Sequence, residues 1–130
     1  MPEVHICYTK RAFLGRPSSA ADRGRKLVEL VQRECAERFS VDERVIGPEA
    51  FSVYGKLVSG WSTQSHDVIV RVTLHHYQER VINGDDNARG LGEAVSAFLN
   101  SQELVMLRGR LSVGVSLVFA EIAFADCSED

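Results

Sequence analysis

Residues 66–77 have the sequence HDVIVRVTLHHY, and this stretch decides the fold more clearly than any other. Apolar side chains occupy every second position, so four of them share one face of an extended strand: Val68, Val70, Val72 and Leu74. The opposite face carries a mixed set: Ile69, Arg71, Thr73 and His75. This alternation predicts a strand in a sheet with one face packed on a core.

The strand is followed by the clearest helical pattern in the chain. The turn residues Asn83 and Gly84 introduce it. Apolar residues then recur at helical spacing, on one face of the predicted helix: Leu91, Ala94, Val95, Phe98 and Leu99. Residues 111–124 predict a long apolar strand. The second half therefore has the order strand, helix, strand.

The first half repeats this order. Residues 4–8 alternate as a strand, a helix with an apolar stripe is predicted to begin near Ser19, and residues 51–61 predict a second, more polar strand. We interpret the chain as one domain, 1–130, with pseudo-repeats 1–65 and 66–130. Duplicated β-α-β units with right-handed crossovers predict an α+β fold, a four-stranded sheet with both helices on one face.

The composition is that of an ordinary folded domain. The chain has 130 residues, 45% hydrophobic and 25% charged, and a formal net charge of -3, which offers no general affinity for nucleic acid. Its three cysteines, Cys7, Cys35 and Cys127, lie far apart and predict reduced thiols. With no apolar run of about 18 residues and no signal-peptide pattern, we expect a soluble cytoplasmic protein without membrane contact.

Pro2 is the first candidate for chemistry. Initiator methionine is usually removed when the next residue is small, and proline qualifies, so the mature chain would begin with a secondary amine. An α-amino group titrates near ~8, which makes this amine a candidate general base. The alternative is structural, because a proline at the first position of a strand removes no ladder hydrogen bond.

Other motifs are few. Arg71 on a half-buried strand needs either an ion-pair partner or a substrate anion. The adjacent His75 and His76 point to opposite faces of a strand, which does not suit two ligands of one metal. The chain has no phosphate-binding loop, no catalytic Ser-His-Asp motif and no cofactor fingerprint. We therefore expect no metal and no cofactor.

The duplicated order with an amino-terminal proline resembles the tautomerase superfamily, whose members use that proline as base, acid or nucleophile. The stretch 65–74, the helix 91–99 and the last strand at 116–119 resemble the 5-carboxymethyl-2-hydroxymuconate isomerases in particular. The resemblance implies a homotrimer and a cofactor-independent isomerase of a small carboxylated keto or enol acid, of the kind used in aromatic degradation.

The resemblance also suggests substrate-binding residues. In the shorter 4-oxalocrotonate tautomerases a proline, a strand and a Gly-Arg pair occur in this order, which points to Arg16, with Arg11 in the inserted residues 10–14 as a rival. The isomerases carry an arginine on the strand after the first helix, where this chain has Tyr54 and Lys56. With Arg71, we expect these residues to line a pocket near Pro2.

Two alternatives stay open. The same base could serve a decarboxylase or a hydratase of this superfamily. If Met1 is retained or the pocket cations are missing, the protein would instead be a non-catalytic trimeric binding module.

Overall fold

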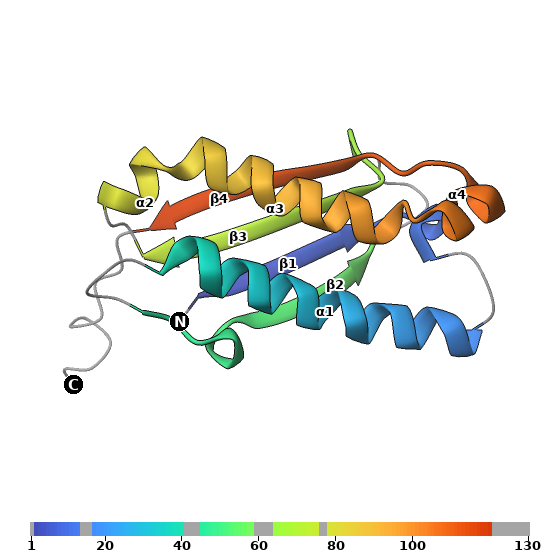
Figure 1. Cartoon of the computed structure of the whole chain (residues 1–130), viewed down its shortest axis with the longest axis horizontal. Helices are drawn as coiled ribbons and strands as arrows, with labels where there is room; N and C mark the ends of the chain where they lie inside the picture. The colour runs from blue at the N-terminus through green and yellow to red at the C-terminus, as the bar shows by residue number, and fades with distance from the viewer. Residues whose placement is uncertain (1, 14–16, 41–44, 59–63, 76–77, 121–130) are drawn as a thin grey trace.

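A computed structural model describes residues 2–13, 17–40, 45–58, 64–75 and 78–120 of the chain (Figure 1). Its elements, in chain order, are β1 (Glu3–Tyr8), the 3₁₀ turn η1 (Lys10–Phe13), α1 (Pro17–Phe39), the 3₁₀ turn η2 (Pro48–Ala50), β2 (Ser52–Leu57), β3 (Val68–His75), α2 (Gln78–Ile82), α3 (Gly84–Leu99), α4 (Gln102–Arg108) and β4 (Val113–Ala120).

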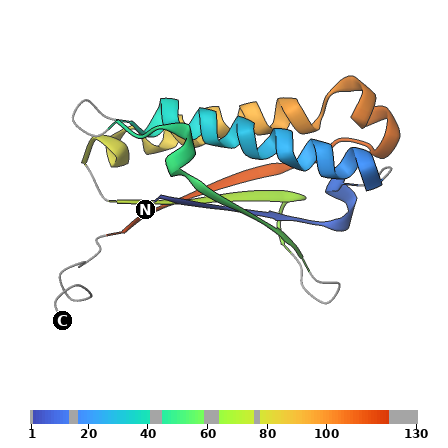
Figure 2. The same cartoon turned by 90° about the horizontal axis from the view of Figure 1, so that it is seen from below.

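The four strands form one sheet in the order β2-β1-β3-β4. β1 is parallel to β2 and β3 is parallel to β4, as the crossover through a helix in each half requires, while β1 and β3 run antiparallel in the centre. Figure 2 shows the long helices α1 and α3 on the same side of the sheet. The predicted α+β architecture is therefore confirmed.

The core lies between the sheet and the two long helices. The apolar face predicted for β3 is fully buried, together with side chains from β1 and from both helices: Val4, Ile6, Leu27, Val31, Cys35, Phe39, Val68, Val70, Val72, Leu74, Leu91, Val95 and Leu99. Alternate residues of β4 pack against this core: Val113, Val115, Leu117 and Phe119. Burial of one such side chain contributes about 1.5–3 kcal/mol.

The boundaries differ from the predicted ones in physically simple ways. α1 begins at Pro17 rather than near Ser19, because proline suits the first helical position, where an N–H would have no partner. β2 ends at Leu57, and residues 59–61 of the predicted strand lie outside the described residues, as do residues 121–124 of the last strand. α2 and α4 were not predicted, since helices this short show no complete apolar period.

The second face of the sheet carries no helix among the described residues (Figure 2). We call it the open face. It presents the side chains that alternate with the core residues, and Tyr54 of β2 and Val118 of β4 are half exposed there. Polar and charged residues of neighbouring strands lie side by side on this face, among them His5 and Arg71.

Candidate active site

Pro2 lies immediately before β1, one of the two central strands. Its carbonyl accepts a hydrogen bond of 3.2 Å from the Ser52 N–H, so the strand pairing with β2 extends to the proline. Glu3 is opposite Thr73 on β3, and one further step along this antiparallel register places Pro2 beside Leu74. Pro2 is half-buried, so this end of β1 is neither sealed in the core nor fully in solvent.

A row of polar side chains crosses the open face three residues beyond Pro2. Register brings His5 opposite Tyr54 on one side and opposite Arg71 on the other. The His5 ring stacks on the Tyr54 ring, with ring centroids 5.1 Å apart, and its Nε2 lies 3.3 Å from Glu3 Oε1. This stack and hydrogen bond fix the imidazole beside Arg71.

The predicted substrate-binding residues on β2 and β3 lie at different distances from Pro2. Arg71 and Tyr54 are three residues along the sheet, which at ~3.3 Å per residue is about 10 Å. Lys56 pairs with Cys7 and is two residues further away, at about 17 Å by the same spacing. All three side chains are exposed. Along the sheet Arg71 and Tyr54 are therefore nearer to Pro2 than Lys56 is, and Arg71 also lines a hollow with His66 and Ile69 toward the other end of β3.

Arg11 lies at the opposite end of β1. Its Nη1 is 3.1 Å from Asp67 Oδ2 and its Nη2 donates to the Arg110 carbonyl at 2.8 Å. Asp67 also accepts the Ser112 N–H at 2.9 Å. The six residues of β1 span roughly 20 Å, so the structure does not bring Arg11 to Pro2 within one chain. Arg16 lies outside the described residues.

Arg80 on α2 is a residue that the sequence analysis did not identify. It is 3% exposed, and its guanidinium donates from Nε to the Phe39 carbonyl at 2.9 Å and from Nη1 to the His75 carbonyl at 3.3 Å. Phe39 ends α1 and His75 ends β3, so Arg80 joins these two elements at the end of the sheet where β1 begins (Figure 1). The sequence did contain a signal for Arg80, because an arginine follows the first strand of each half: Arg11 in the first half and Arg80 in the second.

A second group of arginines lies at the far end, beside Arg11. Arg108 donates from Nη2 to the Leu99 carbonyl at 2.6 Å and so satisfies the C-terminus of α3. Burial lowers the pKa of Arg108, and the positive charges of Arg23 and Arg11 lower it further. These side chains hold helix and strand ends together, at a distance from Pro2.

Neither of the two described cysteines, Cys7 and Cys35, suggests chemistry, and Cys127 lies outside the described residues. Cys35 lies on the buried face of α1, and burial raises the pKa of its thiol to about 12, with a smaller contribution from the charge of Glu34. The thiol therefore stays protonated and behaves as a small apolar core group. Cys7 is half-buried on the open face.

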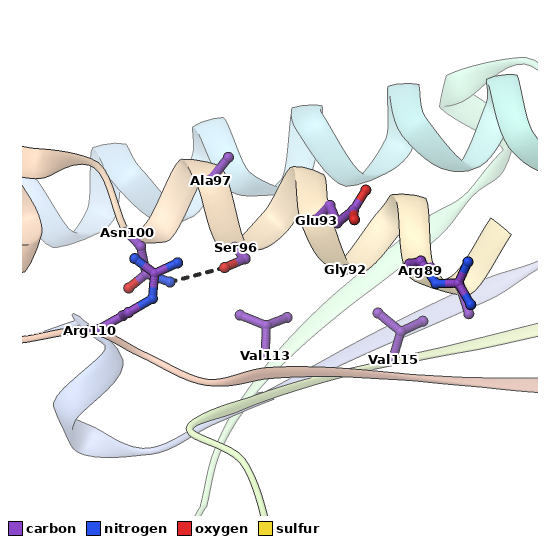
Figure 3. A pocket seen from close by; sticks show the side chains of 10 residues that line it. Arg89, Gly92, Glu93, Ser96, Ala97, Asn100, Arg110, Val113 and Val115 are labelled. Carbon is purple, nitrogen blue, oxygen red and sulfur yellow. Dashed lines mark hydrogen bonds between the residues drawn. The ribbon is translucent and has the colours of Figure 1, made fainter. Parts of the chain in front are cut away.

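A groove of about 600 Å³ runs between α3 and β4 (Figure 3). Val113 and Val115 point into it from β4, and Arg89 and Arg110 stand near its two ends. Asn100 closes the side near Arg110, because its amide donates to Ser96 Oγ at 3.1 Å and to the Leu111 carbonyl at 2.9 Å. Pro2 does not line this groove, which lies on the helix-covered side of the sheet.

Two further properties concern the described residues alone. No three or more histidine, cysteine, aspartate or glutamate side chains among them are grouped so that they could hold a metal ion. His76, which the sequence analysis considered, lies outside them. None of the helices described is long and apolar enough to cross a membrane.

Comparison with known proteins gives the fold. No protein-family model matches the chain, and no curated protein matches its sequence. A solved structure of wild-type fused 4-OT, a symmetric trimer, is similar with a TM-score of 0.61 at 12% identity, over 92% of this chain and 85% of that chain. An asymmetric trimer of fused 4-OT has a TM-score of 0.57 at 9% identity, with the same coverage.

A third solved structure, N1, a member of the cis-3-chloroacrylic acid dehalogenase family, has a TM-score of 0.54 at 12% identity, over 92% of this chain and 75% of that chain. These proteins are members of the tautomerase superfamily. The chain therefore has the tautomerase fold, and the predicted resemblance is confirmed at the level of the fold.

Proposed function

We propose that the protein is a cofactor-independent tautomerase that moves a proton on a small carboxylated keto or enol acid, with the amine of Pro2 as general base. The observation that carries this proposal is the position of Pro2, directly before a central strand of a tautomerase fold. Removal of Met1 would expose that amine. The same base would serve decarboxylation or hydration, which the products of an assay distinguish.

The surroundings of Pro2 favour a neutral, basic amine. A free α-amino group titrates near ~8, and partial burial and nearby cations both disfavour its protonated form. Pro2 is half-buried, and the buried guanidinium of Arg80 lies at the same end of the sheet. In the proposed mechanism both features would favour the neutral amine near neutral pH, where a general base is most effective.

The carboxylate of the substrate needs a cation within reach of that amine. Arg71 is the best placed of the predicted cations within one chain, and its planar fork suits a carboxylate better than the point charge of Lys56. A guanidinium beside the reacting carbon would also stabilise the enolate that forms when the proton leaves. Arg11 could contribute only from a second copy of the chain, because it lies at the other end of β1.

The pH dependence of the reaction tests the amine directly. With phenylenolpyruvate or 2-hydroxymuconate as substrate, kcat/KM of the processed protein is expected to rise with pH along a single limb. Its midpoint should fall below the model α-amino value of ~8, because burial and cations lower the pKa of the amine and so free the base at lower pH. A pH–rate profile from pH 5 to 9 measures this midpoint. A flat profile, or a midpoint above ~8, would contradict an amine in this environment.

A homotrimer is part of the proposal. The open face and the edge strands β2 and β4 present half-exposed apolar groups that a small domain cannot cover by itself, among them Leu57 and Val118. The fused 4-OT structures are trimers, which supports the same assembly here. Sedimentation at micromolar concentration is expected to give one species of three times the 14.4 kDa chain mass. A stable monomer would contradict it.

A cytoplasmic location completes the proposal. Its support is the odd number and wide spacing of the cysteines, which do not form the paired framework usual in exported small domains.

A further inference from the structure

His75 is the last residue of β3, so it lies at the rim of the open face and not in its middle. β3 ends at the same end of the sheet where β1 begins (Figure 1). The residues that alternate with His75, among them Val72 and Leu74, are buried in the core, so the His75 side chain is on the side of the sheet away from the helices. His75 is half-buried.

The strand register brings His75 to the amine of Pro2. The antiparallel ladder of β1 and β3, continued by one step, pairs Pro2 with Leu74, and the next position along β1 faces His75. In the processed chain of the proposed function no residue of β1 occupies that position, because Met1 has been removed. Opposed residues of an antiparallel pair have Cα atoms about 4.5–5.5 Å apart, so a substrate held at the amine lies within reach of the His75 ring.

The neighbours of His75 on the open face do not extend over this position. Ala120, which is opposite His75 on β4, carries only a methyl group. Glu3 is the first residue of β1 on this face, and its carboxylate lies 3.3 Å from His5 Nε2, which is further along β1 and away from Pro2. The end of the sheet beside Pro2 therefore has His75 as its ring-bearing donor.

The backbone of His75 is held in place from the other side of the sheet. Its carbonyl accepts a hydrogen bond of 3.3 Å from Arg80 Nη1, and Arg80 Nε donates to the Phe39 carbonyl at 2.9 Å. Arg80 is 3% exposed, so this contact is shielded from water. A donor that stabilises developing charge must be oriented before the reaction begins, and a fixed backbone provides part of that orientation.

From this geometry we propose that His75 is a further catalytic residue of the Pro2 site, whose ring N–H donates a hydrogen bond to the enolate oxygen of the substrate. The proposal rests on the proposed function. With phenylenolpyruvate, the Pro2 amine takes the proton of the enol hydroxyl and leaves a negative charge on that oxygen. The oxygen then forms the carbonyl, while the C=C electron pair takes the same proton back from the Pro2 ammonium at C3. His75 keeps its own proton, and an imidazole has an N–H in both its neutral and its charged form.

Substitution of His75 tests the donor. His75→Leu removes the N–H, and in processed protein it is expected to lower kcat for phenylenolpyruvate about 10²- to 10³-fold, the usual cost of one oxyanion donor, with a smaller change in KM. His75→Gln keeps an N–H donor and should recover most of this loss. Gln102→Leu is the matched control, because it removes a donor from an exposed position on α4, far from Pro2, and should leave kcat unchanged.

The kinetic outcomes separate this proposal from the proposed function. The role of His75 is overturned if His75→Leu keeps the wild-type kcat, if His75→Gln is as slow as His75→Leu, or if Gln102→Leu is equally slow. Failure of the proposed function has another signature, since processed and Met1-retaining protein of the wild-type sequence would then be equally active. Circular dichroism and sedimentation confirm that each variant folds and assembles as the wild type does.

Binding of oxalate tests the same contact without turnover. Oxalate carries a second negatively charged oxygen next to a carboxylate, as the enolate does. NMR titration of processed protein at pH 7 is expected to shift the ring protons of His75, which are identified by their absence in His75→Gln. His75→Leu should weaken oxalate binding at least tenfold, and Gln102→Leu should not weaken it. Unshifted His75 signals, or equal affinity in His75→Leu, would overturn the contact whatever activity the protein has.

Discussion

Protein that retains Met1 is expected to lose about 10²- to 10⁴-fold in kcat/KM for phenylenolpyruvate relative to processed protein, the usual contribution of a general base. The added residue converts the secondary amine of Pro2 into an amide nitrogen, which has no basicity. The carbonyl of Pro2 still accepts the hydrogen bond from the Ser52 N–H, and every core contact of β1 stays in place. The loss therefore reports on the amine alone.

One preparation supplies both samples for this comparison. Protein isolated with Met1 in place is measured before and after treatment with methionine aminopeptidase, and intact mass confirms each state. Both samples must show the same circular dichroism and the same sedimentation. Equal activity in the two states would mean that Pro2 is only the first residue of a strand, and the binding-module alternative would then be preferred. Pro2→Ala is less informative, because it leaves a primary amine that can still act.

The parts of the fold that were predictable are those with a complete local period. β3 alternates over eight residues with its apolar face fully buried, and α3 buries Leu91, Val95 and Leu99 at helical spacing. Such a pattern predicts both the type of secondary structure and which of its faces is buried. The short helices α2 and α4 lack a full period, and their positions depend on contacts with distant segments that no local pattern contains.

The sequence allowed individual residues of the candidate site to be named, but it did not predict how far apart they lie in the fold. Pro2 could be identified from its residue type and its position in the sequence. Its separation from Arg11 depends on the length of β1 and on the contact of Arg11 with Asp67 at the far end of that strand. The antiparallel pairing of β1 with β3 brings the segment after β3 to the start of β1. For that reason Arg80, rather than Arg11, lies at the Pro2 end of the sheet.

Arg80 gives the largest expected effect on stability. Its guanidinium donates to carbonyls of two elements that are far apart in sequence, Phe39 at the end of α1 and His75 at the end of β3. Methionine fills a similar volume without any donor, so Arg80→Met leaves both carbonyls without this partner in a buried site. A hydrogen bond that involves a charged group contributes about 1.5–3 kcal/mol, so the loss of both bonds costs about 3–6 kcal/mol.

We therefore expect Arg80→Met to lower the free energy of unfolding by about 3–6 kcal/mol, and Arg80→Lys to lower it by less, since one ammonium can satisfy only part of this geometry. Denaturant unfolding at a fixed protein concentration measures the change, because assembly makes stability depend on concentration. Arg89→Met is the matched control. Within the described part of the chain its exposed side chain pairs with Asp86 on the same helix alone, and the expected change is within about 0.5 kcal/mol. If Arg80→Met changed stability no more than this control, water or other donors would have to satisfy the two carbonyls. Arg80 would then not be the residue that holds the end of β3 against α1.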